Sequence, residues 1–336
     1  MAEILFIKTS SLGDVVHHMP AITDARRHLP GAHLTWLVEE AYAPLARLHG
    51  AVDKVIPVAA RRWRVKLHQP TAWRETLREI GRFRRAIRER PYDAVIDSQG
   101  LMRTALMTRQ ARGRRHGYDM ASIREPPASL FYDVRHRVEW GAHAIFRNRA
   151  LCGLALGYAP KPPIDFGLDR TKIARPGPAG NYAVLLHATA RPPKEWAEAH
   201  WIAVARGALD RGLDVVLPWG TDVERTRSEA IAAALKCGTA GGQNRVRVPD
   251  RRPLDEVAAM IAGAAVVVGV DTGLVHVAAA LGVPLVAIFI GSAPGLTGPM
   301  GSGPIAIVGG APGKTGALMP DPAEVLGALD RLRSAP

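Results

Sequence analysis

Cysteine is nearly absent from this 336-residue chain. Only Cys152 and Cys237 occur, far apart and in no spacing typical of a metal site. A disulfide framework needs more cysteines at short spacings, so this usage excludes such a framework and favours a reducing compartment.

Long apolar runs are lacking as well. The most apolar stretch, residues 258–270, is thirteen residues long and rich in alanine and glycine, whereas a membrane-spanning helix needs about 20 apolar residues. Lys8 and Asp14 interrupt the apolar N-terminus too early for a signal peptide. We therefore expect a cytoplasmic protein that touches a membrane surface at most.

Several functional motifs are also missing. The chain has no G-x-S-x-G, no P-loop and no D-x-D, and its histidine and carboxylate spacings do not indicate a metal site. The loop after the first apolar run has one glycine, whereas a dinucleotide fingerprint needs three. If the protein binds a diphosphate, helix N-termini and Lys194 would have to neutralise the negative charge of that diphosphate.

Positive charge is abundant, and it is unevenly distributed. Residues 1–160 hold 26 Lys and Arg against 15 Asp and Glu, a net of +11, whereas residues 161–336 hold 18 against 16, a net of +2. A basic half indicates a polyanionic partner: nucleic acid, an anionic membrane, or a phosphorylated or carboxylated substrate. Aromatics make up only 6% of the chain, and no recognition motif with interleaved exposed aromatics occurs, which argues against nucleic acid.

A strand-then-helix rhythm runs through both halves of the chain. Apolar runs predict strands, and the segments between them have helical periodicity. The strands expected are Ile4–Ile7, Leu34–Val38, Val55–Pro57, Ala94–Ile96, Tyr182–His187, Asp214–Pro218, Val266–Val270 and Leu285–Ile290. This alternation is typical of an α/β fold with parallel sheets.

Two domains follow from the length and from one change in composition. Residues 161–163 and 176–180 are rich in proline and glycine, which is typical of a linker. We expect an N-terminal domain over 1–165, a linker over 166–180, a second domain over 181–318 and a terminal helix within 319–336. In the first domain, Ala72–Glu89 reads as a long basic helix whose buried stripe is Leu77, Ile80, Phe83 and Ile87.

Asp14 is the first candidate for chemistry. It follows a strand and the polar loop Lys8–Ser11, and it opens a helix. Ligands of open α/β sheets bind at this end of the strands. The local pattern leaves two interpretations open, a reactive carboxylate or a helix cap alone.

The second half contains comparable strand ends. Asp271, Thr272 and Gly273 follow an apolar strand, where the free N–H groups of a helix would meet an anion, and His276 lies one turn further on. A capped helix with a packed histidine is the alternative. Other strand ends offer Thr189 with Lys194, and Glu224 as an acceptor for a ribose. Three such ends in one domain favour a nucleotide site.

The ordered set of motifs resembles the lipopolysaccharide heptosyltransferase I family of ADP-heptose glycosyltransferases. The resemblance spans nearly the whole chain and rests on Lys8–Val15, Val38–Glu40, Arg61–Trp63, Tyr92–Gly100, Arg124–Pro126, Leu186–Thr189, Leu217–Gly220 and Asp271–Gly273. It implies a GT-B fold: two Rossmann-like domains facing a cleft, with a C-terminal helix that crosses back to the first domain. It also implies transfer of L-glycero-D-manno-heptose from ADP-heptose to the Kdo residue of Kdo2-lipid A, at the cytoplasmic face of the inner membrane.

Residue roles follow from the same resemblance. Asp14 would be the general base, and no metal or other cofactor would be required. The donor would be held by Thr189, Lys194, Glu224, Asp271, Thr272, Gly273 and His276. The acceptor would be held by Ser11, Gly13, Arg61, Arg62 and Arg124. We expect a monomer that binds an anionic membrane surface and no nucleic acid.

The sequence departs from the family pattern at one place. Ala190 replaces the second threonine that usually follows Thr189, and residues 191–193 are unusual beside the family's more acidic loop. One hydrogen bond to the donor phosphate is therefore missing or replaced. Two alternatives remain open: a related transferase with another acceptor, such as a second-heptose transferase, or a basic nucleotide- or membrane-binding protein without catalysis.

Overall fold

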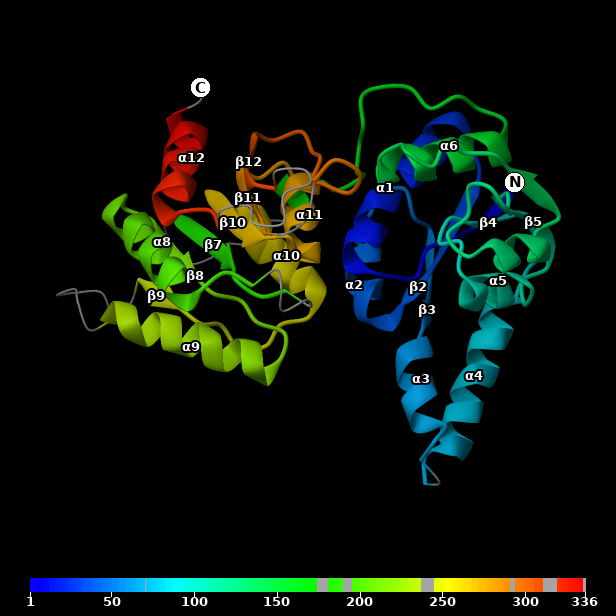
Figure 1. The fold of residues 1–336 in the computed structure, drawn as a ribbon. Coiled ribbons are helices and arrows are strands. Elements are labelled where there is room, and N and C mark those ends of the chain that lie inside the picture. The colour runs from blue at the N-terminus through cyan, green and yellow to red at the C-terminus, as the bar shows by residue number, and fades with distance from the viewer. Residues whose placement is uncertain are drawn as a thin grey trace. The chain divides into compact units, whose positions relative to one another are not determined.

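The computed structural model describes residues 1–69, 71–173, 181–189, 195–236, 245–290, 294–310 and 319–334. The chain divides into two compact units, Met1–Gly167 and Leu168–Pro336. Each unit is described by itself below (Figure 1).

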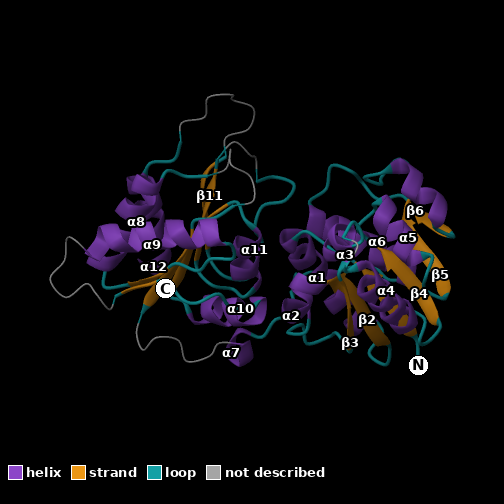
Figure 2. Ribbon diagram, turned by 90° about the horizontal axis from the view of Figure 1, so that it is seen from below, coloured by secondary structure: helices purple, strands orange, loops and turns teal. Residues whose placement is uncertain are grey.

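The first unit is built on a six-stranded parallel sheet of order β3-β2-β1-β4-β5-β6. Its strands are β1 (Glu3–Ile7), β2 (His33–Glu39), β3 (Lys54–Val58), β4 (Tyr92–Asp97), β5 (Gly113–Tyr118) and β6 (Val134–His136). Its helices are α1 (Leu12–His28), α2 (Ala43–Ala46), α3 (Ala60–Lys66), α4 (Trp73–Ile87), α5 (Met102–Thr108) and α6 (Ala144–Leu156), with short 3₁₀ turns at Glu40–Tyr42 and Pro126–Phe131. Helices lie on both sides of the strands (Figure 2), as short βαβ connections require.

The second unit repeats this plan. Its sheet has the order β12-β11-β10-β7-β8-β9, which is the first unit's order when strands are counted from β7. The strands are β7 (Tyr182–Leu186), β8 (Asp214–Val216), β9 (Val246–Arg247), β10 (Val266–Val270), β11 (Leu285–Phe289) and β12 (Ile305–Gly309). The helices are α7 (Arg170–Ile173), α8 (Glu198–Asp210), α9 (Asp222–Lys236), α10 (Leu254–Gly263), α11 (Gly273–Ala280) and α12 (Pro322–Ser334).

Part of the expected linker packs on the second unit. Arg170 of α7 donates hydrogen bonds to the carbonyls of Ala262 and Ala264, at 2.7 and 3.0 Å, and Ile173 is buried. Residues 168–173 therefore belong to this unit, and residues 174–180 lie outside the described part of the chain.

The terminal helix packs on the second unit. The apolar face of α12, Val325, Ala328 and Leu329, is buried in the core of that unit, and the expectation that the helix also reaches the first domain stays a prediction. Gly207 of α8 makes this packing possible, because a Cβ there would meet the Leu326 side chain at 2.6 Å. Arg211 and Asp330 add an ion pair between α8 and α12.

The buried stripe expected for the helix α4 is correct at its end and wrong at its start. Phe83 and Ile87 are buried in the core against the sheet, whereas Leu77 is 49% exposed and Ile80 is only partly buried. The first turns of α4 extend past the sheet (Figure 1), so the sheet does not cover Leu77 there.

Candidate functional site at the strand ends

Both sheets reverse their strand order at one place, between β1 and β4 in the first unit and between β7 and β10 in the second. In open α/β sheets, ligands bind outside the carboxyl ends of the strands at such a switch point. The loops after these four strands begin at Lys8, Ser98, His187 and Asp271. The sequence candidates Asp14, Thr189 and Asp271 thus lie at or directly beside the two switch points.

Asp14 occupies the third position of α1 and is half-buried. Its Oδ2 accepts hydrogen bonds from the backbone N–H of Ser11 at 2.8 Å and from the Ser11 hydroxyl at 3.1 Å. Asp14 is therefore the N3 residue of a capping box whose N-cap is Ser11, so it takes part in capping without being the N-cap that one interpretation of the sequence expected. The same bonds fix the orientation of the carboxylate, and they engage only one of its two oxygens.

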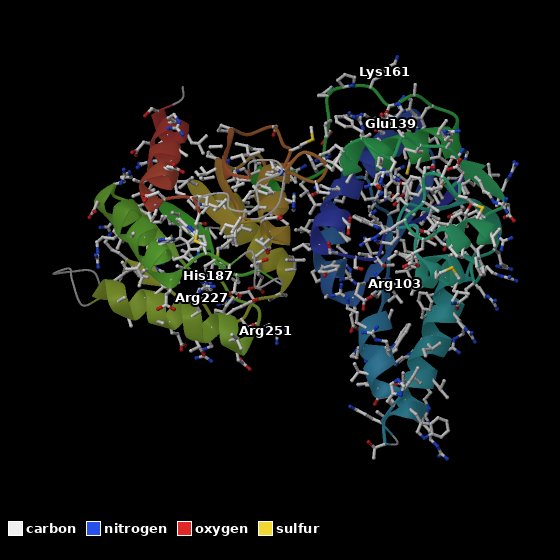
Figure 3. All side chains as sticks on the ribbon, viewed as in Figure 1. Arg103, Glu139, Lys161, His187, Arg227 and Arg251 are labelled. Carbon is white, nitrogen blue, oxygen red and sulfur yellow. The ribbon has the colours of Figure 1, made fainter. Side chains whose placement is uncertain are left out.

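The loop before Asp14 is held by side chains that are distant in sequence. Gln99 Oε1 accepts from the backbone N–H groups of Thr9 and Ser10, both at 3.1 Å. Arg103 of α5 donates to the Ser10 hydroxyl at 2.6 Å and is labelled in Figure 3. The sequence analysis did not single out Gln99 or Arg103. Their only signal was that they follow a strand end, β4, next to β1.

A buried lysine lies behind this loop. The ammonium of Lys8 donates to the carbonyl of Ser98 at 2.9 Å and contacts Asn148 Oδ1 at 3.5 Å. Burial lowers the pKa of Lys8, and the nearby carboxylates of Asp14 and Asp97 oppose that shift. Lys8 thus places positive charge beneath the strand ends, a role that the sequence interpretation as a plain polar loop missed.

Asp97 ends β4 and is fully buried. It accepts hydrogen bonds from the Tyr132 hydroxyl at 2.8 Å and from the backbone N–H groups of Gln99 and Gly100 at 2.9 and 3.3 Å. Burial raises the pKa of Asp97, and these bonds oppose the rise. The carboxylate is therefore occupied in shaping the loop after β4 and is not presented at the surface.

The three predicted acceptor arginines lie at this same edge but in different settings. The backbone N–H of Arg61 donates to Glu39, which ends β2, and its guanidinium is 5.9 Å from the Tyr42 ring centroid. Arg124 is exposed, and the next residue, Glu125, donates its backbone N–H to the carbonyl of Gly100 at 3.2 Å.

Arg62 has a structural task instead. Its guanidinium binds both oxygens of Glu40, at 2.8 and 2.9 Å, and also contacts Glu79 of α4 at 2.8 Å. The indole N–H of Trp63 donates to the same Glu79 at 2.7 Å. Arg62 therefore fastens α3 to α4, and its prediction as an acceptor ligand has less support than that of Arg61 or Arg124.

In the second unit, Thr189 and Asp271 are brought together. The Thr189 hydroxyl donates to the backbone carbonyl of Asp271 at 3.4 Å. Thr272 is the N-cap of α11, yet its side chain makes no capping hydrogen bond. The hydroxyl of Thr272 is thus not used for capping the helix.

Close packing brings α11 down onto the sheet. Gly269 in β10 allows it, because a Cβ there would lie 2.7 Å from Val275 and 2.9 Å from Leu186. His276 is 6% exposed, so it is a packed histidine on the inner side of α11. Of the predicted donor residues on this helix, Thr272 and Gly273 stand at its start and His276 supports it from beneath.

Glu224 closes the loop after β8. Its Oε2 accepts from the backbone N–H groups of Gly220 and Thr221, at 2.7 and 3.1 Å. The indole N–H of Trp219 donates to the Pro249 carbonyl at 2.7 Å, and the Arg225 guanidinium lies 5.4 Å from the Trp219 ring centroid. One oxygen of Glu224 is therefore taken by the loop, and its role toward a ribose stays a prediction.

His187, which the sequence analysis did not select as a site residue, directly follows β7 and is fully buried. Its Nε2 lies 2.7 Å from the hydroxyl of Ser228. Burial lowers the pKa of His187 to about 4, with a further contribution from the positive charge of Arg227. Figure 3 labels His187 and Arg227. A neutral, hydrogen-bonded imidazole thus supports the strand end from which Thr189 follows.

Some expectations are not addressed by the described residues. Lys194 and Ala190 to Pro193 lie outside them. Among the described residues, no group of three or more His, Cys, Asp or Glu side chains is placed to hold a metal ion. In the same part of the chain, none of the helices combines the length and apolar character needed to cross a bilayer.

Comparison with known proteins shows which family this chain resembles. The sequence pattern of glycosyltransferase family 9 (heptosyltransferase) matches residues 80–315. Lipopolysaccharide heptosyltransferase 1 of Pseudomonas aeruginosa is 45% identical over 303 residues, which cover 89% of this chain and 81% of that protein.

Solved structures agree with the sequence relatives. Escherichia coli heptosyltransferase WaaC with ADP matches with a TM-score of 0.87 at 38% identity, over 98% of this chain and 99% of that one. The same E. coli protein with ADP-2-deoxy-2-fluoro heptose matches with a TM-score of 0.81 at 37% identity, over 98% of each chain. By contrast, lipopolysaccharide heptosyltransferase 2 of E. coli K12 is similar, at 34% identity, over only 115 residues, 32% of this chain and 30% of that protein.

The predicted fold class is confirmed: α/β, GT-B in type, with two Rossmann-like parallel-sheet units. The predicted enzyme class is confirmed as well, because the family match covers more than half of the chain and the P. aeruginosa relative is similar over most of its length. The chain belongs to glycosyltransferase family 9, the heptosyltransferases.

Proposed function

We propose that the protein transfers L-glycero-D-manno-heptose from ADP-heptose to the Kdo residue of Kdo2-lipid A, with inversion at the anomeric carbon. The observation that carries this proposal is the sequence similarity to lipopolysaccharide heptosyltransferase 1, 45% identity over 89% of the chain, whereas sequence similarity to heptosyltransferase 2 covers only 32% of it. A second-heptose transferase is therefore the weaker candidate.

Asp14 acts as the general base in this proposal. Ser11 holds Oδ2, so Oδ1 faces the remaining direction and takes the proton of the attacking Kdo hydroxyl. The hydroxyl oxygen bonds to the anomeric carbon as the bond to the ADP oxygen breaks. Lys8 and Arg103 stabilise the loop that carries this carboxylate.

A single reactive carboxylate accounts for inversion. A double displacement would need a second carboxylate as nucleophile, about 5–5.5 Å from the first. Asp97 is the other aspartate at the switch point of the first unit, and its oxygens already accept bonds from Tyr132, Gln99 and Gly100. Direct attack by the acceptor hydroxyl is the reaction that this arrangement favours.

The second unit would bind the donor. The N-terminus of α11, with Thr272 and Gly273, presents N–H groups and a partial positive charge to the diphosphate. Negative charge grows on the leaving ADP in the transition state, so such preorganised donors lower the barrier. Thr189, Asp271 and, on the sequence argument, Lys194 and Glu224 complete the donor residues. We expect no metal requirement, and transfer in the presence of a chelator tests this.

The acceptor would meet the basic first unit. Kdo2-lipid A carries carboxylates and phosphates, and Arg61 and Arg124 lie at the edge that holds Asp14. Because the acceptor is a lipid, we further propose that the enzyme works at the cytoplasmic surface of the inner membrane, where its basic residues are attracted to anionic lipids. We also propose that it is a monomer.

A product assay tests this function. The purified protein is given ADP-heptose with either heptose-free Kdo2-lipid A or the same acceptor already bearing one heptose, and the products are analysed by mass spectrometry and NMR. We expect transfer to the heptose-free acceptor and an inverted anomeric centre. Transfer only to the heptose-bearing acceptor, or retention of configuration, would overturn the proposal.

A further inference from the structure

Four large apolar side chains are exposed at one end of the first unit. Val65 and Leu67 are 58% and 44% exposed, and Trp73 and Leu77 are 43% and 49% exposed. They come from the end of α3, the following turn and the start of α4, and we call residues 64–69 and 71–78 the hairpin tip. Exposed apolar side chains gathered in this way mark an interaction surface.

The hairpin tip stands on a rigid base. Phe83 and Ile87 bury the second half of α4 in the core, and the Trp63 ring packs on Phe83 with centroids 5.6 Å apart. Glu79 then joins both helices through Arg62 and Trp63. Above this base, the first turns of α4 reach about 10 Å further, at 1.5 Å per residue, and Figure 1 shows both helices extending beyond the sheet.

The hairpin tip extends outward beyond the edge of the sheet that holds Asp14. The helix α3 starts just after the carboxyl end of β3, and α4 runs back to the amino end of β4. In a parallel sheet all carboxyl ends share one edge, so the start of α4 lies beyond that edge. The exposed apolar side chains therefore extend outward from the side of the unit to which the acceptor would come.

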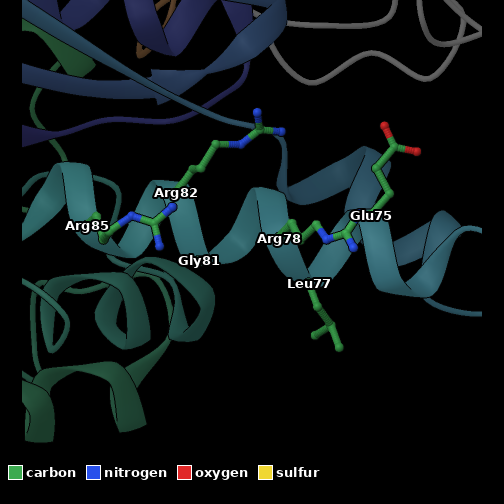
Figure 4. A pocket seen from close by; sticks show the side chains of 6 residues that line it. All are labelled: Glu75, Leu77, Arg78, Gly81, Arg82 and Arg85. Atoms are coloured by element: carbon green, nitrogen blue, oxygen red, sulfur yellow. The ribbon is translucent and has the colours of Figure 1, made fainter.

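Basic side chains surround the apolar ones. Residues 60–90 contain eleven Lys and Arg against three Glu, a formal net of +8 out of +13 for the whole chain. Arg78, Arg82 and Arg85 line a shallow groove on α4 together with Glu75, Leu77 and Gly81 (Figure 4). Within the described part of the chain, the guanidinium groups of these three arginines form neither hydrogen bonds nor ion pairs.

We propose that the hairpin tip docks on an anionic lipid bilayer, with Trp73, Leu77, Val65 and Leu67 entering the headgroup region and the arginines of α4 binding lipid phosphates. The inference rests on the proposed function, because a lipid acceptor requires the enzyme to reach a membrane, and it assigns that contact to one element. Apolar side chains that enter by several ångströms, ringed by cations, are the usual composition of an interfacial anchor.

The convex shape of the tip favours a bilayer over a peptide or a nucleic acid. A peptide needs a groove lined by apolar side chains, whereas only one of the six residues that line the groove on α4, Leu77, has a large apolar side chain and three are arginines. Single-stranded nucleic acid binds to several stacked aromatics, and Trp73 is the one exposed aromatic among the described residues of the tip.

Vesicle sedimentation without substrates tests the apolar part. The wild type is expected to bind vesicles containing phosphatidylglycerol and not vesicles of phosphatidylcholine alone. Trp73→Gln with Leu77→Gln should weaken this binding at least about tenfold, because the insertion is lost. The matched control is Leu106→Gln with Leu130→Gln, two residues of the same unit with 52% and 63% exposure, which should change binding less than about twofold.

The charged part has its own pair of variants. Arg78→Gln with Arg82→Gln should reduce binding to phosphatidylglycerol vesicles about tenfold or more. Arg206→Gln with Arg331→Gln, exposed arginines of α8 and α12, should leave it nearly unchanged. Equal losses in both pairs would mean that net charge alone binds the membrane, and this would overturn the assignment to the hairpin.

Quenching of tryptophan fluorescence tests whether Trp73 enters the bilayer. Brominated phospholipids should quench the fluorescence of the wild type, and Trp73→Phe should retain vesicle binding while losing most of that quenching. Unchanged quenching in Trp73→Phe would contradict insertion of the tip, and so would tighter binding to a single-stranded oligonucleotide than to vesicles.

A water-soluble, deacylated Kdo acceptor separates this inference from the proposed function. The Trp73→Gln/Leu77→Gln variant should transfer heptose to it at the wild-type rate. If the wild type transfers heptose but binds no vesicle, the docking inference fails alone. If it binds vesicles through the tip but transfers no heptose, the proposed function fails alone.

Discussion

The two sheets have the same strand order, yet the polar groups at their carboxyl ends differ. In the first unit the switch point carries a carboxylate, Asp14, above the buried side chains of Lys8 and Asp97. In the second unit it carries Asp271, the hydroxyls of Thr189 and Thr272 and the N-terminus of α11, with a neutral His187 as support. Under the proposed function, the same framework would provide a basic, reactive edge in one unit and an anion-binding edge in the other.

This difference indicates how two units of the same architecture would serve different roles, one in acceptor chemistry and the other in donor binding. Strand order and helix packing are common to both units, so they cannot distinguish acceptor chemistry from donor binding. A few residues directly after the strands do so. The net charges of the two halves, +11 and +2 by sequence, follow the same division.

The largest expected effect is on the reactive edge. Asp14→Asn keeps an oxygen that accepts the hydrogen bond of the Ser11 N–H, so the fold should persist. It removes the base, so we expect turnover to fall roughly 10²–10⁴-fold. Steady-state kinetics measure this, with circular dichroism as the check on folding. Retention of more than about a tenth of the activity would leave Asp14 with capping alone.

A second prediction compares ion pairs in the two units. Arg149 and Asp24 in the first unit form a pair at 2.6 Å with side chains only 5% and 4% exposed. Arg149→Met leaves a buried carboxylate unpaired and should lower the free energy of unfolding by about 3–5 kcal/mol. Arg211→Met in the second unit breaks the exposed pair with Asp330 and should cost about 1 kcal/mol or less. Urea unfolding of both variants measures the contrast, and equal losses would contradict it.

The third prediction concerns acid. His187 has a pKa of about 4 in the folded protein against about 6.5 when unfolded. Between these values the unfolded state binds one more proton, so stability is full above pH 6.5 and is lost as the pH falls toward 4. Wild type should lose about 1.4 kcal/mol per pH unit more than His187→Gln in this window. Urea unfolding at several pH values tests the slope, and parallel slopes would show that His187 does not titrate this way.

The smallest effect is expected at the anion-binding edge. Thr272→Val keeps the shape of the N-cap residue, whose hydroxyl makes no capping bond, so stability should change little. Loss of one hydrogen bond to a charged phosphate should weaken ADP-heptose binding about tenfold. Calorimetry measures this against Thr226→Val, an exposed threonine of α9, which should bind the donor as the wild type does.

Much of the fold could be predicted from apolar runs. The strands β1, β7, β10 and β11 are continuous apolar segments buried on both faces, and all four were expected. The strand β5, Gly113–Tyr118, was missed because it contains two arginines and a histidine and no apolar run. The position of β5 in the sheet is fixed by its pairing with β4, and the local sequence pattern does not reveal this pairing.

The site was predictable where its residues follow a strand, and not where distant residues support it. Asp14 and Thr272 stand directly after strands. Gln99 and Arg103 act on Thr9 and Ser10 about 90 positions away, a relation that only strand order creates. Leu77 shows a different limit of prediction from sequence. Helical periodicity identifies the inner face of α4, but it does not show where the core beneath that face ends.

A crossed measurement tests the central claim that the two edges act separately. The donor dissociation constant and the turnover number are determined for Asp14→Asn, Thr272→Val and the double variant. The account predicts that Asp14→Asn binds ADP-heptose as the wild type does. It also predicts that the double variant combines the turnover of one parent with the donor affinity of the other. A loss of donor affinity in Asp14→Asn comparable to its loss of turnover would contradict the account.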